Sequence, residues 1–100
     1  MQLFRACIGE TIGTFLLVLF GIGAVATSVL TNGLEGLWQV AVVWGLGVAL
    51  AIYITSSVSG AHLNPAVSLA FAIFRRNEFP HTRLLAYWAA QLMGGILAGL

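Results

Sequence analysis

The segment 58–65, with the sequence VSGAHLNP, holds the residues most able to do chemistry in an otherwise apolar chain. Pro65 suits the first position of a helix, where its missing N–H costs nothing, and Asn64 suits the N-cap before it. The start of such a helix presents free N–H donors and about half a positive charge, which disfavours cations. The Asn64 amide could add a donor, unless this residue is only a helix cap. The backbone carbonyl groups that could serve as acceptors belong to Gly60, Ala61, His62 and Leu63.

Neutral donors and acceptors in one place could replace the water that a small uncharged solute loses on entering a pore. Glu10 is a second polar residue of interest, because a carboxylate inside a membrane is costly and needs a partner. Loop N–H groups or His62 could be that partner, which would make Glu10 a structural brace; the alternative is that Glu10 reaches water at the membrane surface. His62 is expected to be structural.

The composition indicates a membrane protein. Hydrophobic residues make up 60% of the 100 residues, charged residues 7%, and the mean hydropathy is +1.01. With a net charge of +1, the chain has no excess of basic residues that would indicate nucleic-acid binding. The single cysteine, Cys7, has no partner for a disulfide, and we expect no metal or cofactor site. With no Lys and no phosphate-binding loop, the sequence indicates no enzyme.

The elements that position these residues are expected to be helices. Apolar runs at 11–30 and 37–56 are long enough to cross a hydrocarbon core of about 30 Å. A third run, 84–100, is still apolar at the last residue, which suggests a sequence cut within or just after a third span. We therefore predict spans over about 4–30, 37–57 and 82–100. A cleaved signal peptide is a less favoured interpretation of the first run.

A helix over 65–74 would be only about 15 Å long, half the thickness of the hydrocarbon core. The residues 58–64, if extended, could descend about 23 Å to the midplane, so that the short helix returns to the side of entry. Such a re-entrant loop needs a water-filled cavity or surrounding protein to satisfy its backbone.

The arginines indicate the orientation. Arg5, Arg75, Arg76 and Arg83 all fall on one side of the predicted spans, and cytoplasmic segments carry excess Arg and Lys. We expect a multi-pass protein of the cell membrane with a cytoplasmic N-terminus. Small residues at every fourth position predict close packing between the spans. These rows are Gly9 and Gly13, then Ala41, Gly45 and Ala49, then Ala86, Ala90, Gly94 and Ala98.

The segment 59–67, with the Asn-Pro-Ala triplet at 64–66, resembles the first signature loop of the major intrinsic protein family, the aquaporins and glycerol facilitators. The segment 10–15 resembles the first helix of that family, and 44–48 resembles the second helix of bacterial glycerol facilitators. The resemblance covers residues 1–100 and implies an all-α membrane protein with an aquaporin-like bundle. This chain would be its N-terminal repeat, with three transmembrane helices and a re-entrant half-helix.

The resemblance also implies roles for individual residues. Asn64 would contact the solute, the carbonyls of residues 60–63 would line the pore, and Pro65 and Ala66 would shape the loop on the Glu10 brace. Trp44 would form an apolar wall of the selectivity constriction, with Val48 and Ile52 continuing its face. A Trp packed against protein or lipid is the alternative. The Trp favours glycerol over water, and the family precedent is a homotetramer in the lipid bilayer.

The sequence therefore predicts a passive channel for small uncharged solutes, glycerol or water or both. One alternative is an inverted repeat of a secondary transporter, which also uses broken helices at the midplane. Another is a non-conducting membrane protein of half the length.

Overall fold

The computed structural model describes residues 2–100, and in this range the chain forms helices and no strand. The expectation of an all-helical protein is therefore confirmed. The elements are α1 (Leu3–Leu30), α2 (Leu37–Ser59), α3 (Pro65–Phe74), a short 3₁₀ turn (His81–Arg83) and α4 (Leu84–Gly99).

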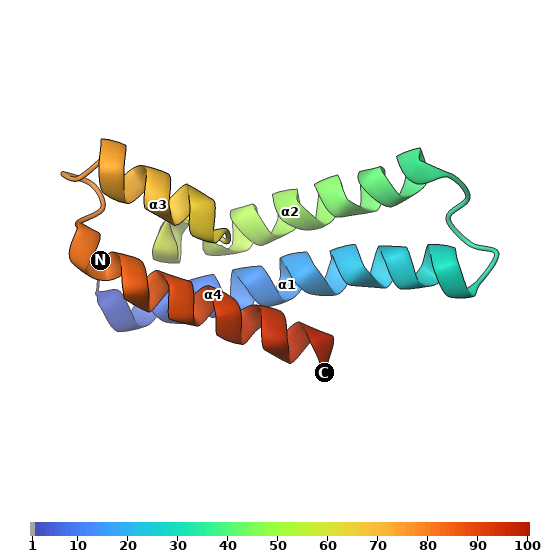
Figure 1. Ribbon diagram of the computed structural model, residues 1–100, viewed down its shortest axis with the longest axis horizontal. Coiled ribbons are helices and arrows are strands. Elements are labelled where there is room, and N and C mark those ends of the chain that lie inside the picture. Colours follow the sequence, from blue (N-terminus) through green and yellow to red (C-terminus); the bar gives the residue numbers. More distant parts are fainter. Residues whose placement is uncertain (1) are drawn as a thin grey trace.

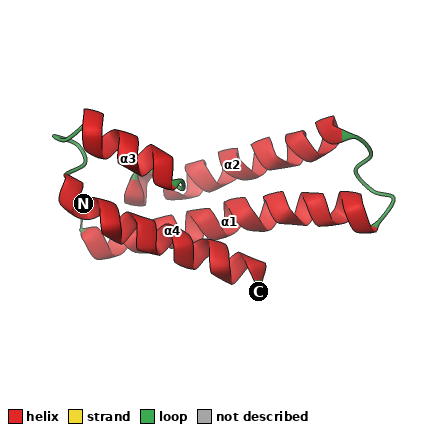
Figure 2. Cartoon of the chain, in the orientation of Figure 1, coloured by secondary structure: helices red, strands yellow, loops and turns green. Residues whose placement is uncertain are grey.

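The helices form an elongated bundle that measures 47 × 25 × 19 Å along its principal axes. α1 lies at the centre of the packing, because it contacts both α2 and α4, while α3 contacts α4. α3 begins near the middle of the long axis and runs back to the end of the molecule where α1 and α4 begin (Figure 1). The loop 31–36 joins α1 to α2 at the opposite end (Figure 2).

Two helices, α1 and α2, are long and apolar enough to cross a membrane. They leave many large apolar side chains uncovered, such as Leu46 at 66% exposure, which suits a lipid environment better than water. α3 has 10 residues and α4 has 16, about 24 Å, so neither reaches the length of the first two. The prediction of three spans and a re-entrant helix thus stays a prediction.

Small residues explain the close approach of α1 and α4. An added Cβ at Gly94 would overlap the Thr11 carbonyl oxygen and lie 3.0 Å from the Phe15 backbone nitrogen. Because those atoms belong to the backbone of α1, only glycine fits there. The predicted rows on the first and third spans do include buried contact residues, Gly9 and Gly13 on α1 and Ala90 and Gly94 on α4.

The predicted row on the second span is not the face that α2 packs against α1, because Ala41 and Gly45 are exposed on this chain. The buried face of α2 instead carries Gly47, Ala51, Thr55 and Ser59. Gly47 sets this face, since an added Cβ there would lie 2.7 Å from the Cβ of Phe20 on α1.

The loop before α3 is shorter and more tightly turned than expected. α2 continues through Ser59, so that the loop covers 60–64 and not 58–64. Gly60 ends α2 in the left-handed conformation (φ 85°), and its N–H donates to the Ser56 carbonyl at 2.9 Å. Ala61 and Leu63 also have positive φ, 53° and 54°, so the chain is not the extended run that the sequence suggested.

Candidate functional site

The start of α3 is capped by Asn64. Its Oδ1 accepts a hydrogen bond from the Ala66 backbone N–H at 2.8 Å, and Pro65 occupies the first helical turn without needing a partner for a missing N–H. Asn64, Pro65 and Ala66 are exposed on this chain. Because Oδ1 serves the cap, the Nδ2 group of Asn64 is the part of the amide that can donate to another molecule.

The loop before Asn64 is held by the Glu10 carboxylate, which is 0% exposed. Its Oε2 accepts from the Ser59 hydroxyl at 2.6 Å and from the His62 N–H at 3.0 Å. Its Oε1 accepts from the Leu63 N–H at 2.8 Å and from the Gln91 amide at 2.8 Å. The carboxylate thus joins α1, the end of α2, the loop and α4, and its loop partners are the backbone N–H groups suggested by the sequence.

The His62 ring is packed inside an aromatic cluster. It stacks on Phe71 with the ring centroids 4.5 Å apart, and it contacts Phe79 and Tyr87 at 4.7 and 5.0 Å. Its Nδ1 lies 2.9 Å from the Ser68 hydroxyl, which also accepts from the Gln91 amide. With 8% exposure, His62 has the surroundings of a structural residue.

Leu63 also fixes the loop through its side chain. Its side chain is 5% exposed and occupies the space beside Gly13, where an added Cβ would overlap Leu63 Cδ2. The left-handed backbone of Leu63 is unusual for a residue with a branched side chain. The packing on Gly13 and the hydrogen bond to Glu10 together explain how the loop keeps this conformation.

Sequence reasoning missed several polar partners in this network. They are Ser59, Ser68, Tyr87, whose hydroxyl donates to the Ser59 carbonyl at 2.7 Å, and Gln91. Ser68 and Gln91 could have been found, since a polar side chain inside an apolar helix usually serves a buried partner. Nothing in the spacing of Ser59 or Tyr87 pointed to their contact.

Trp44 and Val48 lie on α2 and are both half-buried, while Ile52 is exposed. Trp44 is about 22 Å along α2 from Ser59, the last residue of that helix. The outer ring atoms of Trp44 lie over Gly21 of α1. Trp44 is therefore packed against protein on one side.

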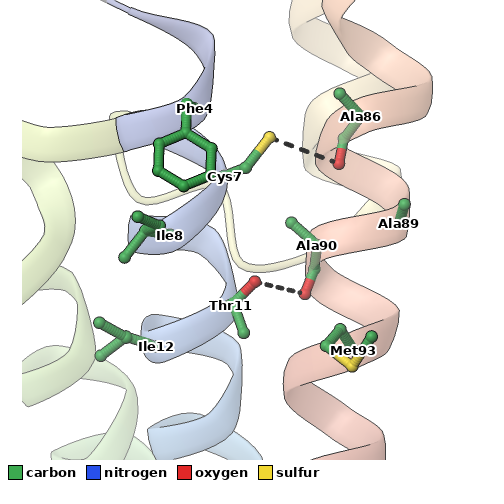
Figure 3. Close-up of a pocket in the computed structure, with 9 residues that line it drawn as sticks. All are labelled: Phe4, Cys7, Ile8, Thr11, Ile12, Ala86, Ala89, Ala90 and Met93. Carbon is green, nitrogen blue, oxygen red and sulfur yellow. Dashed lines mark hydrogen bonds between the residues drawn. The ribbon is translucent and has the colours of Figure 1, made fainter.

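A groove of about 520 Å³ lies elsewhere, between α1 and α4. Figure 3 shows its lining, which includes Phe4, Ile8, Ile12 and Met93. The two polar groups drawn there are already used, because Cys7 Sγ lies 3.8 Å from the Ala86 carbonyl and Thr11 Oγ1 lies 3.1 Å from the Ala90 carbonyl. This groove offers little to a polar solute. Among residues 2–100 no group of three or more His, Cys, Asp or Glu side chains could hold a metal ion.

A bundle of apolar helices in which a buried carboxylate holds the loop before a short, Asn-capped helix indicates a membrane protein of the aquaporin class. The chain belongs to the major intrinsic protein family, whose family model matches residues 1–100.

Known relatives agree with this class. The chain is 45% identical over 92 residues to the glycerol uptake facilitator proteins of Haemophilus influenzae and of Escherichia coli K12, covering 92% of this chain in each case. It covers 34% and 32% of those two proteins, so it spans about a third of their length. The X-ray structure of the aquaglyceroporin from Plasmodium falciparum is similar with a TM-score of 0.86 and 39% identity, over 97% of this chain and 39% of that chain.

Proposed function

We propose that the protein is a passive channel that conducts glycerol and other small uncharged solutes, water included, across the cell membrane. In this proposal α3 enters the membrane only halfway, and its Asn64 start lies at the midplane beside the conducting path. The arginine-bearing ends of α1, α3 and α4 lie on the cytoplasmic side. The complete channel would be a homotetramer in the bilayer, as the family precedent implies.

The main observation in support of the proposal is that the Glu10 carboxylate accepts hydrogen bonds from the backbone of the loop 60–64. Because the His62 and Leu63 N–H groups donate to this buried carboxylate, these two backbone donors have acceptors inside the protein. The carbonyls of residues 60–63 and the Asn64 Nδ2 group then form the polar lining, with Pro65 and Ala66 shaping the helix start. Such a lining exchanges hydrogen bonds with a hydroxylated solute without offering it a net charge.

Trp44 would supply the apolar side of the constriction, with Val48 next to it on the same face of α2. A carbon backbone passes along an indole ring at little cost, while its hydroxyl groups need the polar groups opposite. The similarity to glycerol uptake facilitators supports glycerol as the main solute.

The test is the permeability of vesicles that contain the full-length protein, measured by stopped-flow light scattering with glycerol and with water. We expect rapid glycerol entry that does not saturate and that ionophores leave unchanged. The Trp44→Phe variant should shift the ratio of glycerol to water permeability. Glycerol flux that saturates and stops when ion gradients are collapsed would instead indicate a secondary transporter, the main alternative.

A further inference from the structure

The Trp44 ring, proposed above as a wall of the constriction, lies against Gly21 of α1. The three ring atoms of Trp44 nearest to Gly21 are Cη2, Cζ2 and Cζ3, all on the outer six-membered ring of the indole. An added Cβ at Gly21 would overlap all three. Gly21 is also buried, so the ring covers the α1 backbone at this point.

The two helices are in close contact at this level. Three residues further along α2, Gly47 receives Phe20 of α1, and an added Cβ at Gly47 would lie 2.7 Å from the Phe20 Cβ. Each helix thus places an aromatic side chain over a glycine of the other. A methyl group at Gly21 would therefore displace the Trp44 ring, which turns about two side-chain torsions, before it displaced the helices.

We propose that Gly21 is a positioning residue for solute selectivity: its missing side chain lets the Trp44 ring lie back on α1 and so sets the width of the constriction. This inference depends on the proposed function, in which Trp44 faces the conducting path. Trp44 is half-buried, so a displaced ring moves toward its uncovered side. In the proposed function that side faces the conducting path, so a displaced ring would narrow the path for glycerol more than for the smaller water molecule.

The test measures glycerol and water permeability of the full-length protein in vesicles for Gly21→Ala, Trp44→Phe and the double variant. We expect Gly21→Ala to lower the glycerol to water ratio by about threefold or more, because the displaced ring raises the barrier for the wider solute more than that for water. In the Trp44→Phe background the same substitution should change the ratio little, because a phenyl ring does not extend as far as the outer indole ring. The two substitutions should therefore be strongly non-additive.

Two glycines serve as matched controls. Gly23 lies on the same helix and Gly45 lies next to Trp44, and an added Cβ at either meets nothing within 4 Å. Gly23→Ala and Gly45→Ala should leave the ratio unchanged, since neither touches the ring.

The outcomes separate the two proposals. If Trp44→Phe shifts the ratio and Gly21→Ala does not, the positioning role of Gly21 is overturned and the proposed function stands. If Gly21→Ala lowers water and glycerol permeability equally, or acts additively with Trp44→Phe, its role is only structural and the inference fails. If Trp44→Phe itself leaves the ratio unchanged, Trp44 is no part of the constriction, and both the wall and its positioning by Gly21 are refuted.

Discussion

Asn64 combines two tasks in one side chain, and the structure shows which atoms are available for each. Its Oδ1 caps α3 through the Ala66 N–H, while Nδ2 remains available as a donor. An aspartate keeps the capping oxygen and suits the positive end of the helix dipole, but has no amide donor. An alanine removes both functions.

We therefore predict that Asn64→Asp keeps the cap of α3 but conducts glycerol more slowly, by about fivefold or more, because one hydrogen bond of about 1 kcal/mol is lost in passage and a charge is added to the path. Asn64→Ala should in addition lose about 1 kcal/mol of stability with its cap. Thermal unfolding in detergent and glycerol permeability in vesicles measure the two effects separately. Unchanged permeability of Asn64→Asp would show that the amide donor is not used.

Glu10 has a different task, because its two oxygens accept four hydrogen bonds inside the protein. In Glu10→Gln one oxygen becomes an NH₂ group. Ser59 and Gln91 can turn their side chains to accept from it, but the N–H groups of His62 and Leu63 cannot. At least one buried N–H would lose its acceptor, at a cost of about 1–3 kcal/mol.

The expected result of Glu10→Gln is a lower unfolding temperature in detergent. Glu35→Gln is the matched control, because Glu35 is exposed in the loop between α1 and α2 and should change stability by less than about 0.5 kcal/mol. Equal unfolding temperatures for the two variants would mean that Glu10 does not hold the loop.

At the scale of the elements, the contact between α1 and α4 depends on backbone proximity. An added Cβ at Gly94 would overlap the Thr11 carbonyl oxygen, whereas one at the neighbouring Gly95 meets nothing within 4 Å. Gly94→Ala should thus force the helices apart and cost about 1–3 kcal/mol. Gly95→Ala should be neutral or stabilise by up to about 1 kcal/mol, because alanine favours helix. Unfolding curves of the two variants in detergent make the comparison, and equal curves would disprove the close contact.

The elements differ in how far the sequence determines them. Apolar length indicates α1 and α2, and Asn64 followed by Pro65 marks the start of α3, because both features act locally. The buried face of α2 could not be predicted, since small residues occur on two faces of that helix and only the Phe20 contact selects Gly47. The left-handed backbone of Leu63 gave no signal either, because its contacts with Glu10 and Gly13 impose it.

At the same scale, the site was predicted in part. An isolated acid in an apolar run demands a partner, so the amino-acid pattern offered loop N–H groups, His62 or surface water for Glu10. The structure shows that the partners include the N–H groups of His62 and Leu63. The position of Trp44 on Gly21 could not be predicted, because it depends on the rotation of two helices about their axes. The sequence left a packed Trp and a pore-facing Trp as alternatives, and the half-buried ring contacts protein on one side.

At the scale of the whole molecule, the charged residues at the ends of the helices indicate how the bundle is oriented in a membrane. α1 and α4 begin, and α3 ends, at one end of the bundle (Figure 1). Arg5 lies in the first turn of α1, Arg75 and Arg76 follow α3, and Arg83 precedes α4. The four arginines thus lie at elements that share one end, which favours one orientation in a membrane. Glu35 lies in the loop at the other end.

This charge pattern predicts the behaviour of residues 1–100 expressed alone. A channel of two inverted halves needs its second half in the opposite orientation, but every copy of this segment carries the same arginine end and would insert the same way. Vesicles containing only residues 1–100 should therefore take up glycerol no faster than empty vesicles, while the full-length protein accelerates uptake. Protease digestion of the vesicles gives the control, because uniform insertion should leave the arginine-bearing segment 75–83 accessible from one side. Accelerated glycerol swelling with residues 1–100 alone would show that this segment can form a pore without an inverted partner.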